Sequence, residues 1–259
     1  DHLIGLNLLG VACHKPHWLK PSGLPERASN MIDLNGLLDV FIITNGRASF
    51  NYAKRSVEEQ SGVKFKITII KDLPWLEANN NILENCKSKY FVRVDDDMFL
   101  HPYCIAYLNS ELNEPSSATV ALRSYRLWET AKNQTCTGIK LYQFSLAQKI
   151  KFRINELGKI DKNFKADACS KGYNVNKDTG ILGIHACYSA AENIKYAKMR
   201  GEHKGGRWEY KEKILKSSIG EGKYSLDNQF ATREKLLSDK NRHLNTNFHR
   251  FLENLNKKI

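Results

Sequence analysis

Three consecutive carboxylates, Asp95, Asp96 and Asp97, are the residues of this chain whose type and spacing most clearly suit chemistry. Adjacent carboxylates repel one another, so they are tolerated only where water, a cation or basic groups neutralise their charge. Mg²⁺ and Mn²⁺ prefer oxygen ligands and are commonly held by one or two carboxylates together with phosphate oxygens of a substrate. The triplet therefore predicts a site for a divalent ion and a phosphate; an acidic turn in solvent is the alternative.

The residues on both sides of the triplet indicate where it lies. Tyr90, Phe91, Val92 and Val94 are aromatic or β-branched, which predicts a short strand covered by helices on both faces. Apolar residues also follow the triplet, and exposed turns are seldom enclosed by apolar residues on both sides. Because open α/β sheets bind ligands at the carboxyl ends of their strands, we expect the triplet to line such a site.

Strand and helix patterns alternate before the triplet. We expect strands over residues 3–13, 40–44, 64–72 and 90–94, and helices over residues 24–37, 49–61 and 76–87. This alternation predicts an α/β fold with a mostly parallel central sheet flanked by helices. Further strands are expected at 119–123, 139–145 and 180–185 and a helix at 146–157, whereas the composition of 189–259 predicts helices that pack on the sheet.

The composition points to an anionic partner. The 259 residues include 40 Lys and Arg against 28 Asp and Glu, a formal charge of +12. Phosphorylated substrates, acidic glycans, anionic lipids and nucleic acid all fit this charge. Nucleic acid is the unlikely partner among these, because no known binding motif is present and three carboxylates at a strand end would repel phosphates without a metal.

Apolar run lengths and cysteine spacing bear on the cellular location and on the class of protein. No apolar run reaches the roughly 18 to 20 residues that span a bilayer. We expect a cytoplasmic protein, with peripheral contact between its C-terminal lysines and the anionic inner face of a membrane as a further expectation. The six cysteines show no CxxC spacing, which argues against a zinc ribbon or a disulfide scaffold.

The order of these pieces resembles the GT-A fold glycosyltransferases, most closely those of family 2. In that family, a helix with an Ala-Arg-Asn signature precedes a strand that ends in a DxD motif. Here Ala78-Asn79-Asn80 precedes the strand that ends at 95–97, which aligns Asn80 with the family's donor-contacting Asn. Asn79 departs from the family's Arg. Asn45 stands where the family has the Asp of an Asp-Gly-Ser turn near the nucleotide base.

The resemblance continues downstream and covers about residues 38–187. Leu157–Phe164 resembles the family's Val-Gly-Gly-Phe-Asp-Glu-x-Phe segment, and Ala166–Tyr173 is similar to a shortened Glu-Asp helix that ends in Lys-Ala-Gly-Tyr. The next strand ends in His185, where related enzymes often place a histidine near the metal. Residues 204–208 resemble the QxxRW element, in which Arg207 would bind the diphosphate.

The resemblance implies a GT-A, or nucleotide-diphospho-sugar transferase, fold with a C-terminal helical extension. Residues 1–187 would form the nucleotide-sugar-binding catalytic core, and residues 188–259 would form an extension packed on the same domain. The implied function is metal-dependent transfer of a sugar from a UDP- or GDP-sugar to a glycan or lipid-linked acceptor. The implied cofactor is Mn²⁺ or Mg²⁺, which would stabilise the charge on the leaving diphosphate.

Individual residues receive roles from the same resemblance. Asp97 is expected to ligate the metal, assisted by Asp95 and by His185. Asp95 and Asp96 are further expected on the donor side, as are Asn45, Asn80 and Arg207.

An inverting enzyme also needs a general base, and a carboxylate is the usual choice. Asp167 is favoured narrowly over Asp161 for this role, and either residue could instead cap a helix. Three other functions stay open: a retaining glycosyltransferase, a nucleotidyltransferase and a basic nucleic-acid-binding domain.

Overall fold

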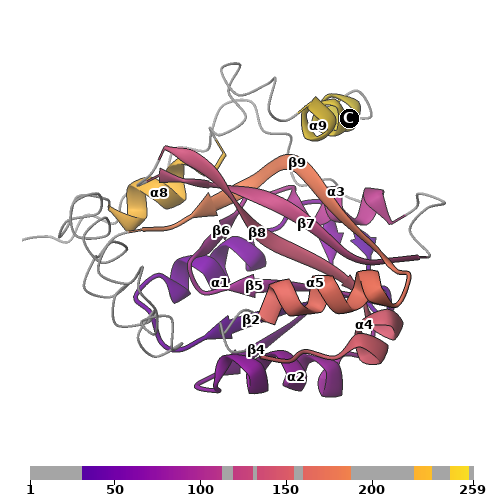
Figure 1. Cartoon of the computed structure of the whole chain (residues 1–259). Helices are drawn as coiled ribbons and strands as arrows, with labels where there is room; N and C mark the ends of the chain where they lie inside the picture. Colours follow the sequence, from indigo (N-terminus) through magenta and orange to yellow (C-terminus); the bar gives the residue numbers. More distant parts are fainter. Residues whose placement is uncertain are drawn as a thin grey trace, which may run out of the picture.

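Figure 1 shows the computed structural model of the chain, which describes residues 31–112, 119–130, 133–154, 160–187, 225–234 and 246–256. Its centre is a seven-stranded sheet with the strand order β4-β2-β5-β8-β7-β9-β6. The strands are β2 (Leu38–Thr44), β4 (Lys66–Lys71), β5 (Tyr90–Asp95), β6 (Met98–Leu100), β7 (Val120–Glu129), β8 (Gln134–Gln143) and β9 (Asn174–His185). Two short strands, β1 (Ile32–Asp33) and β3 (Val63–Lys64), pair separately.

The expected α/β class is confirmed, and the sheet divides into two halves. β4, β2 and β5 are parallel to one another, as the alternating pattern before the triplet predicts. β8 is antiparallel to both β5 and β7, β7 and β9 are parallel, and β6 is antiparallel to β9. Only residues 130–133 separate β7 from β8, and so short a connection can join only antiparallel strands.

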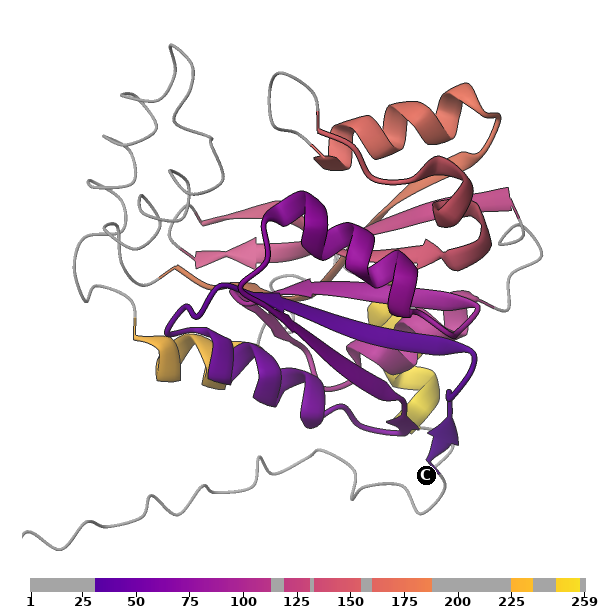
Figure 2. The same cartoon turned by 90° about the horizontal axis from the view of Figure 1, so that it is seen from below.

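Helices cover both faces of the sheet. They are α1 (Phe50–Glu58), α2 (Trp75–Asn85), α3 (Cys104–Glu111), α4 (Phe144–Ile150), α5 (Ile160–Ser170), α8 (Leu226–Thr232) and α9 (Thr246–Asn256). Figure 2 shows α2, α4 and α5 on one face and α1, α3, α8 and α9 on the other.

The burial of β2 explains why its sequence is a continuous apolar run. All seven residues of this strand are buried. Phe41 and Ile43 belong to the core that includes α2, α4 and α5, whereas Val40 and Ile42 belong to the core that includes α3. Alternate residues of a strand point to opposite faces, so a strand between two helical layers needs apolar side chains at every position.

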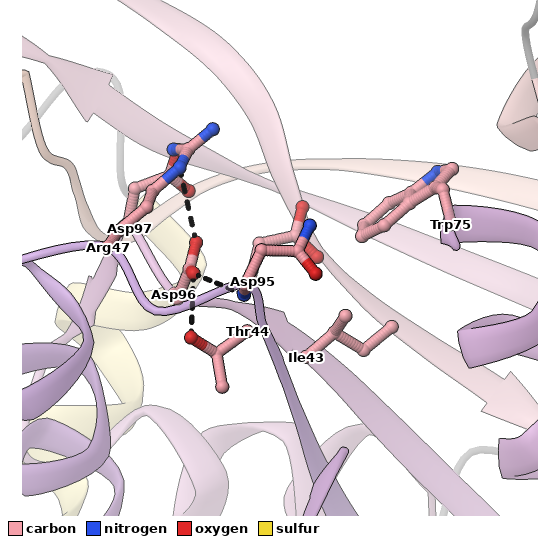
Figure 3. A pocket seen from close by; sticks show the side chains of 8 residues that line it. Ile43, Thr44, Arg47, Trp75, Asp95, Asp96 and Asp97 are labelled. Atoms are coloured by element: carbon pink, nitrogen blue, oxygen red, sulfur yellow. Dashed lines mark hydrogen bonds and ion pairs between the residues drawn. The ribbon is translucent and has the colours of Figure 1, made fainter. Parts of the chain in front are cut away.

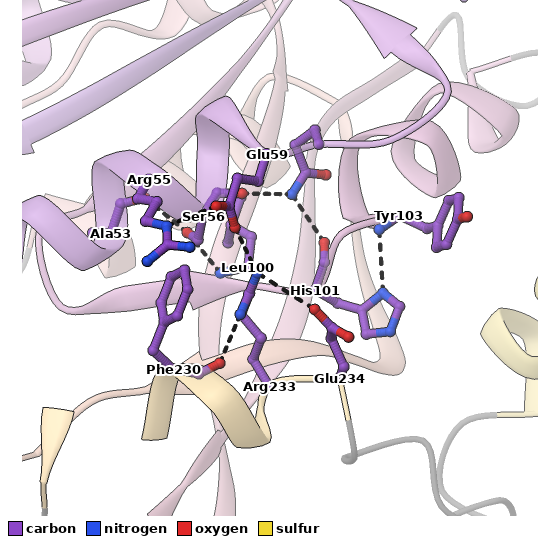
Figure 4. A network of polar contacts seen from close by, with 11 residues as sticks. Ala53, Arg55, Ser56, Glu59, Leu100, His101, Tyr103, Phe230, Arg233 and Glu234 are labelled. Carbon is purple, nitrogen blue, oxygen red and sulfur yellow. Dashed lines mark hydrogen bonds and ion pairs between the residues drawn. The ribbon is translucent and has the colours of Figure 1, made fainter. Parts of the chain in front are cut away.

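The two C-terminal helices among the described residues, α8 and α9, contact helices that cover one face of the sheet. Figure 4 shows Arg233, just after α8, beside Glu59 at the end of α1. The two side chains form an ion pair of 2.9 Å, and the Arg233 guanidinium lies 3.7 Å from the centre of the Phe230 ring. On α9, Phe248 packs against Tyr107 of α3 with ring centres 4.9 Å apart. The boundary proposed at residue 188 stays a prediction.

Two sequence expectations were wrong in the described residues. Residues 31–37 hold β1 and a turn rather than a helix, because Asp33 accepts a hydrogen bond from the backbone of Asn35 and Gly36 has a φ of +78°. The helix expected at 146–157 ends at residue 150, where Lys151 has a φ of 62° that is incompatible with a continuing helix. The strand expected at 3–13 lies outside the described residues.

No helix in the described part of the chain combines the length and the apolar character that a bilayer crossing requires.

Candidate functional site

A pocket lies at the carboxyl ends of the neighbouring parallel strands β2 and β5 (Figure 3). Its lining residues are Ile43, Thr44, Asn45, Arg47, Trp75, Asp95, Asp96 and Asp97. Because Ile43 pairs with Asp95 in the parallel register, the loops that follow the two strands lie side by side. Asp96 and Asp97 are only 6% and 7% exposed, which does not fit an acidic turn in solvent.

Arg47, in the turn after β2, supplies the positive charge that three carboxylates require. Its guanidinium forms an ion pair and hydrogen bond with Asp97, and its Nε lies 3.5 Å from Asp96 Oδ1. Burial opposes the charged form of Arg47, but Asp97 and Asp96 raise its pKa above the usual value. Sequence reasoning missed this residue, although its place just after the end of a neighbouring strand was the available signal.

Asp96 holds the turn after β2 against the turn after β5. Its Oδ2 accepts hydrogen bonds from Thr44 Oγ1 at 2.8 Å and from the Asn45 backbone N–H at 3.2 Å. Burial raises the pKa of Asp96 to about 6, even though Arg47 acts in the opposite direction. This carboxylate therefore ties two loops together and binds a proton more readily than an ordinary aspartate does.

The pairing of β6 with β9 places His185 beside Asp97. Met98 pairs with His185, and the backbone N–H of Ala186 donates to the Asp97 carbonyl at 2.7 Å. His185 Nε2 then lies 3.5 Å from Asp97 Oδ2. Burial lowers the pKa of His185, but the Asp97 carboxylate outweighs this and holds that pKa well above the usual range.

Gly183 allows β6 and β9 to approach this closely. A Cβ atom at this position would lie 2.3 Å from the backbone oxygen of Phe99, closer than two such atoms can stand. The glycine is therefore a condition for the short distance between Asp97 and His185.

Asp95 lies between Arg47 and a second buried arginine, Arg93. Arg93 Nε is 3.5 Å from Asp95 Oδ1, and the Arg93 side chain is 1% exposed. Its guanidinium donates to Asn79 at 2.7 Å and to both oxygens of Asp161 at 3.0 and 3.2 Å.

Trp75 of α2 borders both the pocket and this second arginine. Its ring lies 4.8 Å from the Arg93 guanidinium carbon. Figure 3 shows Trp75 on the side of Asp95 away from Arg47. The pocket therefore has a charged end and an aromatic end.

Asp161, one of the two candidate bases, belongs to an ion-pair network. Besides Arg93, its carboxylate meets Lys140 Nζ at 3.0 Å. Burial raises the pKa of Asp161, but Arg93 and Lys140 outweigh it and lower that pKa below the usual range. In this arrangement Asp161 holds two cations in place and accepts a proton poorly.

Asp167, the favoured candidate base, lies further along α5. Its two oxygens accept hydrogen bonds from the exposed Arg153 at 2.6 and 2.7 Å, and this contact lowers the pKa of Asp167. It is not among the described residues that line the pocket, whereas Asp161 is joined to the pocket through Arg93.

Of the expected donor-binding residues, some line the pocket and others do not. Asn45 lines the pocket. Asn79 is the residue of α2 that is buried and bonded to Arg93, whereas Asn80 is half-buried and absent from the described lining of the pocket. Arg207 lies outside the described residues.

The donor atoms of the pocket suit a hard divalent ion. Asp95 and Asp97 offer carboxylate oxygens, and Oδ1 of Asp95 is buried and receives no hydrogen bond from the described residues. Mg²⁺ and Mn²⁺ take such oxygen ligands. Arg47 now neutralises Asp97, so an ion bound there would share that carboxylate with Arg47 or displace it.

Neither a scan against models of known protein families nor a search of the curated proteins finds a match to this chain.

A search of the solved structures returns alignments that cover part of this chain. A mannosyltransferase from Pyrobaculum calidifontis, in complex with GDP-Man and Mn²⁺, aligns with a TM-score of 0.48 and 14% identity over 81% of this chain and 72% of that chain. S. aureus TarS 1-349 in complex with UDP-GlcNAc aligns with a TM-score of 0.41 and 13% identity over 80% and 74% of the two chains. The inositol-1-phosphate CTP transferase from T. maritima aligns with a TM-score of 0.40 and 11% identity over 66% and 98%.

Proposed function

We propose that this chain is a metal-dependent glycosyltransferase that moves a sugar from a nucleotide-diphosphate sugar to a glycan or lipid-linked acceptor. The observation that supports the proposal is the pocket at the carboxyl ends of β2 and β5, where three consecutive carboxylates lie beside a buried arginine. Open α/β sheets bind their ligands at this edge, and hard ions join carboxylates to phosphates.

Asp97 and Asp95 would hold Mn²⁺ or Mg²⁺. When bound, the ion would stabilise the negative charge that the leaving nucleoside diphosphate gains. His185, whose Nε2 lies 3.5 Å from Asp97 Oδ2, would either ligate the ion or donate a hydrogen bond to Asp97. Asp96, which holds the two turns together, would keep Asp97 and Asn45 in place rather than contact the ion.

Arg47 and Trp75 extend the donor site in two directions. The Arg47 guanidinium would turn to a phosphate oxygen once an ion neutralises Asp97, because a guanidinium binds phosphate as readily as carboxylate. Trp75 offers a flat apolar surface on which a base or a sugar ring can stack. Asn45, Asn80 and Arg207 complete the proposed donor contacts.

For inversion, a carboxylate would take the proton of the acceptor hydroxyl. Asp167 and Asp161 are the two candidates. Asp161 can act only if the acceptor loosens its contacts with Arg93 and Lys140, whereas Asp167 can act only if the acceptor reaches the distal half of α5. A glycan or lipid-linked acceptor, with contact between the basic C-terminal part and an anionic membrane, belongs to the same proposal.

Calorimetric titration with UDP, GDP and CDP, with and without Mn²⁺, tests the donor site. We expect one nucleotide to bind in a metal-dependent manner and its binding to be lost in Asp97→Ala. Glu84→Ala, which removes an exposed carboxylate of α2, is the matched control and should bind normally. If no nucleoside diphosphate binds with or without metal, the proposal is wrong.

The released product then separates sugar transfer from nucleotidyl transfer. A glycosyltransferase releases a nucleoside diphosphate from a nucleotide sugar, whereas a nucleotidyltransferase releases pyrophosphate from a nucleoside triphosphate. Pyrophosphate as the only product would replace the first function with the second.

A further inference from the structure

The two ring nitrogens of His185 face two different groups at the end of β9. Nε2 lies 3.5 Å from Oδ2 of Asp97, whereas Nδ1 lies 4.0 Å from Oε1 of Glu129. The register of β7 and β9 places Glu129 opposite His185, and Cys187 follows two residues later. Ligand atoms of Glu129, His185 and Cys187 all lie within 4.8 Å of one another.

Two of the three residues of this cluster are buried. Glu129 is 6% exposed and Cys187 is 3% exposed, whereas the His185 side chain is 30% exposed. Nδ1 of His185 is buried and makes no hydrogen bond of ordinary geometry with the described residues, and its neighbours are the Glu129 carboxylate at 4.0 Å and the Cys187 thiol. A buried polar atom without a partner is costly, and in native proteins such atoms usually have a protein group, a water or an ion as a partner. The histidine nitrogen is therefore aimed at a position that a ligand can fill.

We propose that Glu129, His185 and Cys187 form a binding site for a thiophilic divalent ion of the Zn²⁺ type. The set joins a sulfur, an imidazole nitrogen and a carboxylate oxygen, the three donor types that proteins use for zinc. Mg²⁺ favours oxygen donors alone, so this site and the Asp95–Asp97 pocket select different metals. The inference stands on these three residues and does not depend on sugar transfer.

The other face of His185 supports the same assignment. A metal-binding histidine usually donates its second ring N–H to a carboxylate, which fixes the ring and its tautomer. Nε2 of His185 faces Asp97 in this way, which leaves Nδ1 for the metal. In this arrangement His185 positions Asp97 by a hydrogen bond and is not a ligand of an ion bound at Asp97.

The main chain holds the proposed ligands in place. The Cys187 backbone N–H donates to the Gln229 side chain, which in turn donates to the Cys187 carbonyl, each at 3.1 Å. The Ala186 N–H is bonded to Asp97, so residues 185–187 are fixed between β6 and α8.

Closure around the ion needs only a small movement. Zinc bonds to nitrogen, oxygen and sulfur imply ligand atoms about 3.3 to 3.8 Å apart in a tetrahedral site. The three ligand atoms lie within 4.8 Å, so side-chain shifts of about 1 Å bring them to that spacing. On metal binding, the Cys187 thiol and Nδ1 of His185 would each give up a proton to solvent, while Nε2 keeps the proton that faces Asp97; three protein ligands leave a fourth position open for water.

Titration of the full chain with Co²⁺ tests the site, because a cobalt–thiolate bond gives a charge-transfer absorption in the near ultraviolet. We expect one equivalent of Co²⁺ to produce this band and Zn²⁺ to abolish it by displacement. Cys187→Ser should lose the band, whereas Cys169→Ser, which changes an exposed thiol of α5, should keep it. Asp97→Ala should keep the band with metal affinity lower by about 10- to 100-fold, because Asp97 supports the ligand without touching the ion.

A measurement on the unaltered protein keeps the inference testable if Cys187→Ser fails to fold. X-ray absorption of the zinc-loaded chain should show a sulfur neighbour at about 2.3 Å. A shell of nitrogen and oxygen alone would overturn the assignment, and so would a cobalt–thiolate band that survives in a folded Cys187→Ser variant.

Discussion

Two buried arginines stand on either side of Asp95, and they are paired in opposite ways. Around Arg93, the single carboxylate of Asp161 meets two cations, Arg93 and Lys140, and its pKa is lowered. Around Arg47, two carboxylates share one guanidinium, and burial raises the pKa of Asp96 to about 6.

The difference separates a structural pair from a binding site. In the first region the contacts of the folded chain satisfy Asp161, which therefore contributes to stability. In the second region Asp96 and Asp97 share Arg47, with His185 beside Asp97, and burial still raises the pKa of Asp96, so the contacts of the folded chain satisfy this carboxylate less well than they satisfy Asp161. Burial alone does not distinguish the two regions; the directions of the pKa shifts do, because the pKa of Asp161 is lowered and that of Asp96 is raised.

Removal of the Asp161 carboxylate should lower the stability of the folded chain. In Asp161→Ala, Arg93 and Lys140 stay buried without their carboxylate, and a broken buried pair destabilises a protein by about 3 to 5 kcal/mol. We expect a value near the lower limit because the Asp161 side chain is 33% exposed. Urea unfolding gives the measurement.

Asp167→Ala is the matched control on the same helix. Its partner Arg153 is exposed, so the unfolding midpoint should stay close to that of the unaltered protein. Equal midpoints for the two variants would show that the Arg93 region is not a structural pair.

The raised pKa of Asp96, in the Arg47 region, should make the stability of the folded chain depend on pH. The pKa of Asp96 is higher in the folded chain than in the unfolded chain, so protonation of Asp96 favours folding. This contribution is fully present below about pH 4 and is lost as the pH rises through about 6, amounting to roughly 2 to 3 kcal/mol.

Unfolding measured between pH 4 and 7 in the unaltered protein and in Asp96→Asn isolates this contribution. The variant should lack the loss of stability that Asp96 causes, because an amide does not titrate in this range. The same pH slope in both proteins would contradict the raised pKa.

Asn79 and Asn80 test which face of α2 supports Arg93. Asn79→Ala removes an acceptor from a buried guanidinium and should destabilise the chain by about 1 to 3 kcal/mol. Asn80→Ala should change stability less, because its side chain is half-buried and has no such contact with Arg93. Thermal unfolding of both variants gives the comparison, and a larger loss in Asn80→Ala would reverse the assignment.

Arg47→Gln should produce the smallest effect and the most specific one. Without the guanidinium, Asp97 is available to an ion, so affinity for Mn²⁺ alone should rise by about tenfold, or about 1.4 kcal/mol. Affinity for a nucleoside diphosphate should fall, since Arg47 is a proposed phosphate contact. Titration with Mn²⁺ and with nucleotide separates the two changes, and weaker Mn²⁺ binding would argue against competition between Arg47 and the ion.

The local parts of this architecture could be predicted from the sequence. The apolar runs of β2 and β5 made the α/β class predictable. The acidic triplet at the end of β5 made the carboxylate-lined strand end predictable. Arg47 and Arg93 were not assigned partners, because their contacts cross between strands and helices that only the three-dimensional register brings together.

Two further features depend in the same way on the three-dimensional arrangement. Asn79 and Asn80 differ by one residue of helical rotation, which a motif alignment does not resolve but which decides the side chain that faces β5. The cluster of Glu129, His185 and Cys187 joins two strands through the register of β7 and β9. No CxxC spacing in the sequence indicates this cluster.

The triplet also has a mechanical role, because the two strands that it connects are not neighbours. β5 is third in the hydrogen-bonded order and β6 is at its far edge, so residues 95–97 join two strands that do not pair with each other. Beyond β6, backbone and side-chain bonds continue through Ala186 and Cys187 to Gln229 of α8. An ion that stiffens the connection between β5 and β6 would slow amide hydrogen exchange in α8, a helix on the opposite side of the sheet from α2.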